Sequence, residues 1–230
     1  MWSYYGSKSK IVDKYPKPTK GLIIEPFAGT AKYALKYWDN DVILIEKNKI
    51  VYRIWKWLQE CSVNDIQKLP RLKQGDDLRL MNFDCEEAKW LMGFMASRAI
   101  ARPNNIAVKR TTTDRPNWIN FCINRISKDI AKIKHWDIRN CDYTNIENKQ
   151  ATWFIDPPYQ FGGQHYPNGN KEIDFKELAK WCKERKGEVI VCENIKANWM
   201  NFEPLTISNQ TRGKGIEVVF LKGWKKNNCI

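Results

Sequence analysis

The stretch that decides the fold is residues 21–48, "GLIIEPFAGTAKYALKYWDNDVILIEKN". Its two apolar runs, 21–27 and 41–48, are rich in Leu, Ile and Val and are predicted to be short β-strands. Between them, residues 28–38 contain Gly29 followed by helix-forming residues, which predicts a turn into a helix. A strand, a helix and a second strand in this order predict parallel pairing through a crossover helix.

The same alternation continues on both sides of an interruption. A helix is predicted directly after residue 48, because apolar residues recur on one face: Ile50, Val51, Ile54, Trp55 and Leu58. Another is predicted over 174–186, where Asp174 and Glu177 resemble a capping pair. Further strands are predicted at 135–143, 151–156, 187–194 and 215–224. The predicted fold class is therefore α/β and Rossmann-like, with a central, mostly parallel sheet.

Residues 61–134 interrupt this alternation. Helical patterns cover 86–101 and 117–134, and a basic, polar loop joins them over 101–116. The second pattern places Trp118, Cys122, Ile126, Ile130 and Ile133 near one stripe. We therefore predict one domain formed by 1–60 and 135–230, with an inserted, mainly helical lobe at 61–134.

The charge of the chain points to a polyanionic partner. Among 230 residues, 39 Lys and Arg face 26 Asp and Glu, a formal net charge of 39 − 26 = +13. A field of this sign favours nucleic acid or an anionic membrane surface. The alternative is a generic lysine-rich surface. The eleven tryptophans are expected to serve mainly in packing, because large aromatic surfaces favour burial.

The cysteine and histidine pattern disfavours a metal or disulfide framework. The seven cysteines are scattered without a C-x-x-C pair, and the two histidines, His135 and His165, lie near no plausible cysteine pair. We expect reduced thiols, no metal, and a cytoplasmic protein of a bacterial or phage-infected host cell, since no signal peptide is evident. No apolar run approaches the ~20 residues of a membrane span.

The stretch "FIDPPYQ", residues 154–160, places a carboxylate, two prolines and an aromatic ring at a predicted strand end. Neither Pro157 nor Pro158 can continue a sheet ladder, so a stiff loop is expected where open α/β sheets bind ligands. The Asp156 carboxylate and the Pro157 carbonyl match the two hydrogens of an –NH2 group. Tyr159 offers a flat face to a planar base. The alternative is a capped turn with a buried tyrosine.

Two weaker signals follow the first two predicted strands. "EPFAGT", residues 25–30, carries Gly29 between a strand and a helix, where backbone can approach a ligand closely. Glu46 ends the next strand, at the distance from the glycine turn where an acid can take ribose hydroxyls. An ordinary β–α turn and a solvated strand-end charge are the alternatives.

Taken together, these motifs resemble the Dam-like, alpha-group DNA adenine methyltransferases. The resemblance runs in order to about residue 222 and joins "YYGSKSK" (4–10), "EPFAGT" (25–30), "EKN" (46–48), "NCDY" (140–143), "DPPY" (156–159) and "TRGKGIEVVF" (211–220). The sequence departs from the family at Tyr5, where the family has proline, at Ser7, where it has a second glycine, and at Thr30-Ala31, where it has a glycine run. No match to the family's DNA-reading hairpin is found in the inserted lobe.

The resemblance implies S-adenosylmethionine as cofactor and assigns roles to residues. Tyr5, Gly6 and Lys8 would line the methionine end, and Glu25, Phe27, Ala28 and Gly29 would contact the methionine part, with Thr30 in the same loop. Glu46 would hold the ribose, next to Lys47, and Asp142 would contact the cofactor's adenine amino group with Tyr143 beside it. Asp156, Pro157, Pro158 and Tyr159 would hold the target adenine.

The expected function is site-specific transfer of a methyl group to the N6 amino group of adenine in double-stranded DNA, after the base is flipped out. The basic residues expected to contact DNA are Arg98, Arg102, Lys109, Arg110 and Arg115, unless they form a solvated loop. Three alternatives stay open: an RNA adenine-N6 methyltransferase, a protein-glutamine methyltransferase, which usually carries Asn where Asp156 stands, and a non-catalytic basic nucleic-acid-binding protein. The oligomeric state and the recognition sequence are not indicated.

Overall fold

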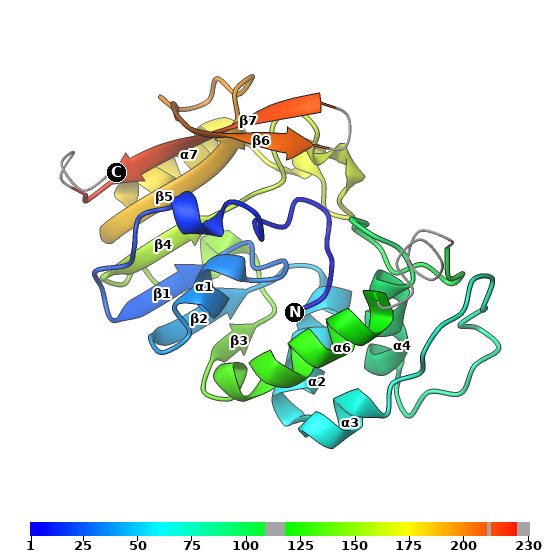
Figure 1. Ribbon diagram of the computed structural model, residues 1–230. Helices are drawn as coiled ribbons and strands as arrows, with labels where there is room; N and C mark the ends of the chain where they lie inside the picture. The colour runs from blue at the N-terminus through cyan, green and yellow to red at the C-terminus, as the bar shows by residue number, and fades with distance from the viewer. Residues whose placement is uncertain (109–117, 211–212, 225–230) are drawn as a thin grey trace. The chain divides into compact units, whose positions relative to one another are not determined.

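The computed structural model describes residues 1–108, 118–210 and 213–224 (Figure 1). Two compact units are formed: unit 1 contains residues 1–7 and 48–135, and unit 2 contains residues 8–47 and 136–230. The helix over 49–60, which the sequence assigned to the larger domain, therefore groups with the lobe. In the described part of the chain, no helix is long and apolar enough to span a lipid bilayer.

Unit 2 is built on a seven-stranded sheet with the order β3-β2-β1-β4-β5-β7-β6. The first five strands pair in parallel, whereas β7 runs antiparallel to both β5 and β6. This confirms the predicted α/β class with a mostly parallel central sheet. The strands are β1 (Leu22–Glu25), β2 (Asp41–Ile45), β3 (Asp137–Arg139), β4 (Ala151–Ile155), β5 (Gly187–Asn194), β6 (Glu203–Gln210) and β7 (Gly213–Lys222).

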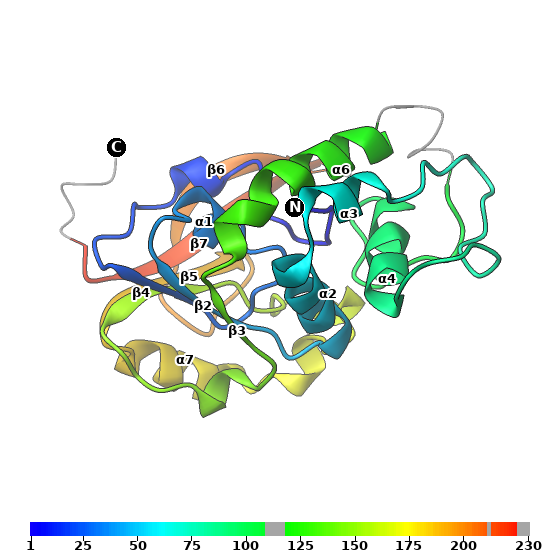
Figure 2. The ribbon, with the colours of Figure 1, turned by 90° about the horizontal axis from the view of Figure 1, so that it is seen from below.

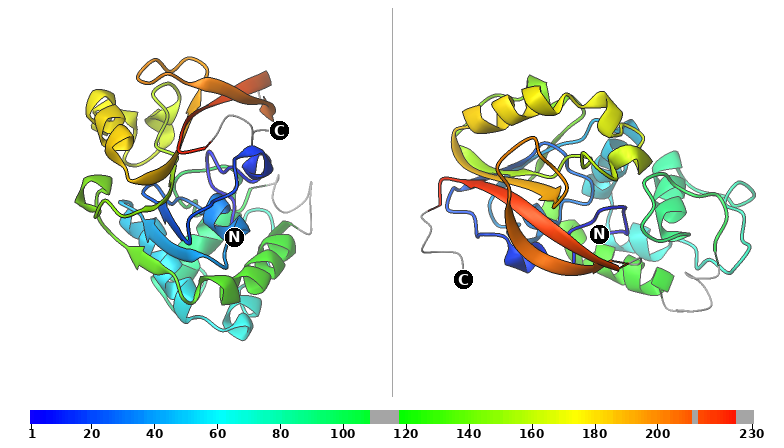
Figure 3. Two further views of the ribbon diagram at one scale, coloured as in Figure 1. Left: turned by 90° about the vertical axis from the view of Figure 1, so that its left-hand side faces the viewer. Right: turned by 90° about the horizontal axis from the view of Figure 1, so that it is seen from above.

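Helices cover both faces of this sheet, which explains why its central strands β1, β4 and β5 are almost entirely buried. Every residue of β4 is buried. Because neighbouring strand residues point to opposite faces, Trp153 packs in a cluster with Leu178 of α7 (Phe175–Glu184), whereas Phe154 stacks on Tyr33 of α1 (Lys32–Lys36) with ring centroids 4.5 Å apart. Figure 3 shows α7 and α1 on opposite sides of the sheet.

The predicted start of α7 is confirmed. The Asp174 carboxylate accepts hydrogen bonds from the backbone amides of Lys176 and Glu177, at 2.9 and 3.1 Å. It therefore satisfies two of the amides that a helix leaves without an intrahelical partner.

Unit 1 is mainly helical (Figure 2). The predicted apolar faces are largely buried: Val51, Ile54, Trp55 and Leu58 in α2, and Cys122 and Ile126 in α6. Trp2 packs against Trp55 and Phe94, with ring centroids 5.1 and 6.4 Å away. The helices are α2 (Lys49–Glu60), α3 (Val63–Gln67), α4 (Glu86–Met95) and α6 (Trp118–Asp129), followed by the 3-10 turn η2 (Ile130–Ile133).

One helix is shorter than predicted. The pattern over 86–101 predicted a single helix, but α4 ends at Met95. Ala99 has a positive φ of 52°, which is incompatible with a continuing right-handed helix. The returning chain also packs tightly on α4, since a Cβ at Gly93 would lie 2.8 Å from the Asn104 carbonyl oxygen. Tertiary packing therefore determines where this helix ends.

Candidate active site at the carboxyl ends of the strands

The order of the strands places a topological switch point between β1 and β4. From β1 the chain moves outward to β2 and β3, then returns and moves the other way from β4 to β5. At such a point the loops after the two central strands diverge, and open α/β sheets bind ligands there. Glu25 is the last residue of β1, and Asp156 directly follows β4. Two residues predicted for the site therefore come from the strands that flank the switch point.

The loop after β1 is held by its backbone and by two carboxylates. Gly29 and Ala31 both have positive φ angles, 47° and 44°. The Glu46 carboxylate, at the end of β2, accepts a hydrogen bond from the Gly29 amide at 3.0 Å. The Glu25 carboxylate accepts the Ala34 amide at 2.6 Å. Burial raises the pKa of Glu25 to about 8, although the Ala34 hydrogen bond acts in the opposite direction.

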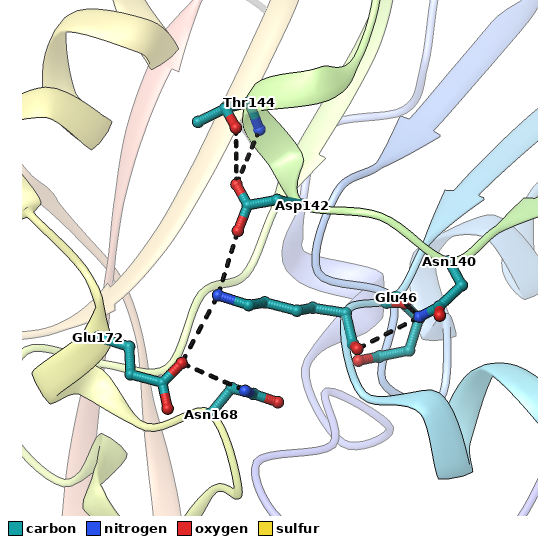
Figure 4. A network of polar contacts seen from close by, with 7 residues as sticks. Glu46, Asn140, Asp142, Thr144, Asn168 and Glu172 are labelled. Atoms are coloured by element: carbon teal, nitrogen blue, oxygen red, sulfur yellow. Dashed lines mark hydrogen bonds and ion pairs between the residues drawn. The ribbon is translucent and has the colours of Figure 1, made fainter.

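A second polar network lies at the ends of β2 and β3 (Figure 4). The Asp142 carboxylate accepts hydrogen bonds from the Thr144 amide and hydroxyl, at 3.1 and 2.9 Å. Its other oxygen pairs with the Lys47 ammonium at 3.2 Å. Partial burial acts to raise the pKa of Asp142, but the Thr144 and Lys47 contacts outweigh it and the pKa is lowered. Asp142 is therefore an ionised acceptor at the surface.

Neighbouring residues fix this network in place. The Asn140 amide donates to the carbonyls of Glu46 and Lys47 at 2.7 and 3.2 Å, joining the segments that follow β2 and β3. The Lys47 ammonium also lies 3.5 Å from the Glu172 carboxylate, which accepts from the Asn168 amide at 3.2 Å (Figure 4).

The aromatic ring of Phe27 connects the loop after β1 to the segment after β3. Its ring centroid lies 5.2 Å from that of Tyr143. The structure thus brings six predicted cofactor residues of unit 2 to one edge of the sheet: Phe27, Gly29, Glu46, Lys47, Asp142 and Tyr143.

The end of β4 carries a more deeply buried arrangement. The Lys8 ammonium lies 2.7 Å from Asp156 Oδ1, 3.8 Å from Glu217 Oε1 and 4.7 Å from the centre of the Tyr159 ring. Burial raises the pKa of Asp156 to about 6; Lys8 opposes the rise and Glu217 adds to it. For Lys8, burial lowers the pKa, but the two carboxylates outweigh it and the pKa lies above its usual range. Asp156 is thus ionised at neutral pH despite its burial.

The loop after Tyr159 is tied to the adjacent strand and to its own later residues. The Gln160 amide donates to the Glu193 carboxylate on β5 at 2.6 Å, and its carbonyl accepts from the Asn170 amide group at 2.6 Å. Gly163 packs so closely that an added Cβ would lie 2.9 Å from the Pro158 carbonyl carbon. These contacts make the segment that carries Pro157, Pro158 and Tyr159 rigid.

Two residues of this arrangement were not predicted from the sequence. Tyr15 and Glu217 lie far apart in the chain, yet the Tyr15 hydroxyl donates to Glu217 Oε1 at 2.7 Å, and the Tyr159 hydroxyl donates to the same oxygen at 2.6 Å. The available signal was the lone acid in the apolar run "GIEVVF". An isolated carboxylate in a buried strand requires partners and marks a candidate site.

Ala28 and Thr30 are buried in the loop after β1, and the other predicted residues belong to unit 1 or lie outside the described ranges. The Tyr5 amide donates to the Ile100 carbonyl at 3.1 Å, and Gly6 has a positive φ of 70°. The Arg98 guanidinium lies over the Trp118 ring at 4.2 Å, and Arg102 is exposed. Lys109, Arg110 and Arg115 fall outside the residues that the structure describes. Within the described ranges, no group of three or more His, Cys, Asp or Glu side chains is arranged to hold a metal ion.

Comparison with known proteins adds little about activity. No family profile and no curated protein matches the chain. Similar solved structures include the Escherichia coli protein yhhF, provisionally named a methyltransferase (9% identity, TM-score 0.38, 95% of this chain and 81% of that chain covered). A Haemophilus influenzae protein provisionally named a methylase is 11% identical, with a TM-score of 0.38; the match covers 88% of this chain and 80% of that chain. These likenesses are too distant to assign an activity, which has to be inferred from the site residues.

Proposed function

We propose that the protein is an S-adenosylmethionine-dependent methyltransferase that acts on the N6 amino group of adenine in DNA. The observation that carries the proposal is the placement of Asp156-Pro157-Pro158-Tyr159 at the switch point, with Lys8 2.7 Å from the carboxylate. This arrangement offers a rigid pair of acceptors beside an aromatic ring. An exocyclic amino group on a planar base has two N–H donors and a flat face, and fits it.

The residues at the ends of β1 to β3 suit the proposed cofactor. Ribose hydroxyls and the adenine amino group are hydrogen-bond donors, and Glu46 and Asp142 are acceptors in the segments that follow the adjacent strands β2 and β3. Asp142 is paired with Lys47, whose side chain is half exposed, so an incoming donor can compete for its oxygen. In this assignment Glu46 holds the ribose, Asp142 the adenine amino group, and Phe27, Ala28 and Gly29 the methionine part. When bound, S-adenosylmethionine supplies an electrophilic methyl group on a sulfonium.

The chain's own residues would activate the target by orientation. The lone pair of an aromatic amino group is delocalised, so the amine is a weak nucleophile. Asp156 and the Pro157 carbonyl would accept its two N–H bonds and aim the lone pair at the methyl group. Lys8 pairs with Asp156 Oδ1, and an ionised carboxylate has further lone pairs with which it would accept from the substrate. In-line positioning of this kind supplies up to about 7–11 kcal/mol in favourable cases.

Transfer of the methyl group would form an N–C bond and break the bond between methyl and sulfur, whose electron pair would stay on the sulfur of the leaving thioether. The amino nitrogen would then carry a positive charge and have to lose a proton. Asp156, with a pKa of about 6, is ionised at neutral pH and can accept that proton. The ion pair with Lys8 keeps this carboxylate charged in a buried site. No covalent nucleophile is required by this scheme.

The nucleic-acid partner is inferred from charge. A formal net charge of +13 favours binding of a polyanion, and phosphate contacts would offset the few kcal/mol that extruding a base costs. We assign this role to the basic residues of unit 1, Arg98 and Arg102, together with Lys109, Arg110 and Arg115.

Methyl transfer from labelled S-adenosylmethionine to duplex DNA, single-stranded DNA and RNA tests the proposal directly. We expect N6-methyladenine in duplex DNA, found by digestion and chromatography of the nucleosides. Methylation of RNA alone would replace DNA as the substrate. No transfer to any of the three, in a protein that binds S-adenosylmethionine by calorimetry, would refute the nucleic-acid assignment. Failure to bind the cofactor would favour a non-catalytic binding protein.

A further inference from the structure

Glu217 is a buried carboxylate that the scheme above does not use. It lies on β7, opposite Asn194 of β5, and its residue surface is only 8% exposed. The hydroxyls of Tyr15 and Tyr159 both donate to its Oε1, at 2.7 and 2.6 Å. The same oxygen lies 3.8 Å from the Lys8 ammonium. One carboxylate oxygen therefore contacts three residues of the arrangement at the end of β4.

Such a group is costly to place inside a protein. A buried carboxylate is tolerated only when hydrogen bonds and opposite charge compensate for its lost hydration. Here two hydroxyls and one ammonium provide that compensation. The cost would be avoided by an apolar residue, and the neighbours Val218 and Val219 are apolar and buried. The strand thus carries a charge at a position that faces Lys8 and Tyr159.

The contacts of Glu217 restrict the groups next to Asp156. Tyr159 follows Asp156 through the two prolines, and its hydroxyl is anchored by Glu217. Tyr15 is itself fixed, since its ring meets Phe154 of β4 edge-on with centroids 5.0 Å apart. The acceptor for Tyr159 is therefore held from two sides, by β7 and by Tyr15.

Lys8 lies between two carboxylates, 2.7 Å from Asp156 and 3.8 Å from Glu217. When a substrate amino group approaches Asp156, two kinds of donor compete for one carboxylate. The Lys8 ammonium can then move closer to Glu217 and keep a counter-ion. A buried unpaired ammonium, which would be strongly unfavourable, is thereby avoided.

We propose that Glu217 is a positioning residue for the methyl-transfer site, which anchors the Tyr159 ring and serves as the second counter-ion of Lys8 when Asp156 engages the target amino group. This proposal rests on the function proposed above and extends it to a residue on β7. Glu217 does not touch the reacting atoms. It acts through Tyr159 and Lys8.

The charge of Glu217 should change the pKa of Asp156 in a definite direction. The negative charge of Glu217 raises the pKa of Asp156, whereas Lys8 lowers it. Replacing the charge at 217 with a neutral amide should therefore lower the pKa of Asp156 below its value of about 6. The titratable groups that influence or face this site are Lys8, Tyr15, Glu25, Tyr159, Cys192, Glu193 and Glu217.

The test is Glu217→Gln, which keeps a carbonyl oxygen for the two tyrosine hydroxyls and removes the negative charge. We expect methyl transfer to slow by about 10- to 100-fold, as misplacement of a reacting group does, while the affinity for S-adenosylmethionine changes little. The acid limb of the pH–rate profile should move to lower pH. In the protein without cofactor, carbon-13 NMR titration of the Asp156 carboxylate should show the same downward shift.

Glu188→Gln is the matched control. Glu188 is a buried carboxylate near the other end of β5, where it accepts from the Thr19 amide and the Thr152 hydroxyl at 3.0 and 2.5 Å. This variant should lower stability but leave the transfer rate and the Asp156 titration unchanged at temperatures where it is folded. A folded Glu217→Gln protein that matches the wild type in both readouts would overturn the proposal.

The two proposals fail in different ways. If the wild-type protein methylates no nucleic acid, the proposed function fails, and the NMR titration still decides whether Glu217 controls Asp156. If Glu217→Gln does not fold, the double variant Tyr15→Phe with Tyr159→Phe removes both hydrogen bonds and keeps the charge. An unchanged transfer rate in that double variant would show that anchoring of Tyr159 is not required.

Discussion

Two lysine–aspartate pairs lie at the same edge of the sheet, and they differ in nearly every electrostatic respect. At the end of β4, Lys8 and Asp156 are 2.7 Å apart, and their side chains are 7% and 21% exposed. At the end of β3, Lys47 and Asp142 are 3.2 Å apart and 49% and 31% exposed. Burial raises the pKa of Asp156. In Asp142, burial acts in the same direction, but the hydrogen bonds from Thr144 and the contact with Lys47 outweigh it, so the pKa is lowered.

The difference shows how the surroundings, not the residue types, determine what an ion pair can do. The β4 pair is desolvated and has Glu217 as a second carboxylate, so any change of charge there affects several groups at once. The β3 pair is screened by water, and its partners can be exchanged. We therefore expect the buried pair to orient the reacting group and the exposed pair to yield an acceptor to a ligand.

The largest effect on methyl transfer is expected for Asp156→Ala, which tests the role of the buried pair. It removes an acceptor that the substrate would need in the transition state, and we expect transfer to fall by about 1,000-fold, as loss of one preorganised catalytic group does. Affinity for S-adenosylmethionine should be largely retained. Transfer rates and calorimetry on the same preparation check both statements. Turnover close to that of the wild type would refute the role of Asp156.

Lys8→Met should have the next largest effect, a loss in the free energy of unfolding. Removing the cation leaves Asp156 and Glu217 buried without it, and loss of one partner of a buried pair costs about 3–5 kcal/mol. Because Lys8 lowers the pKa of Asp156, that pKa should rise further in the variant. Protonation then relieves the repulsion, so the loss in unfolding free energy should be smaller at pH 5 than at pH 8.

Urea unfolding at the two pH values measures this difference directly. A loss that is equal at pH 5 and pH 8 would mean that the ionisation of Asp156 does not determine the effect of Lys8.

The sequence could predict a residue at this edge of the sheet only where the neighbouring residues in the chain marked it. Asp156 was recognised because a strand pattern and two prolines adjoin it in the chain, and Glu46 because it ends the next strand. Tyr15 and Glu217 were not, because their meeting depends on how β7 inserts between β5 and β6. The strand β6 itself was missed, since "EPLTISNQ" is short of apolar residues and begins beside a proline.

The same distinction applies to the pairs of charges. Nothing in the local sequence shows that Lys8 lies beside Asp156, or that Lys47 lies beside Asp142, because each pair joins different strands or loops. The end of α4 at Met95 is likewise determined by the packing of Asn104 against Gly93. Most elements of the fold are therefore predictable from periodicity, whereas the charges that tune the site come from tertiary contacts.

A smaller effect is expected from Glu46→Gln, which tests whether the carboxylate after β2 holds the ribose. The amide can still accept the Gly29 hydrogen bond, so the loop should keep its conformation. The charge and the second acceptor oxygen, which would hold ribose hydroxyls, are lost, and we expect affinity for S-adenosylmethionine to fall about tenfold, the strength of one charge-assisted hydrogen bond. Calorimetry with Asn48→Asp as a control for local charge checks this. Unchanged affinity would remove the ribose assignment.

Lys47→Met should have the smallest effect, and it completes the comparison with Lys8→Met. The Lys47 side chain is half exposed, and pairs of this kind contribute about 0–1 kcal/mol to stability. Because Lys47 helps to lower the pKa of Asp142, that pKa should rise modestly in the variant. Asp142 would remain ionised at neutral pH and become more accessible to a donor from the cofactor. We therefore expect unfolding in urea to change by less than about 1 kcal/mol, with cofactor affinity equal or slightly higher. A loss of stability as large as that of Lys8→Met would show that the two pairs do not differ in the way their burial implies.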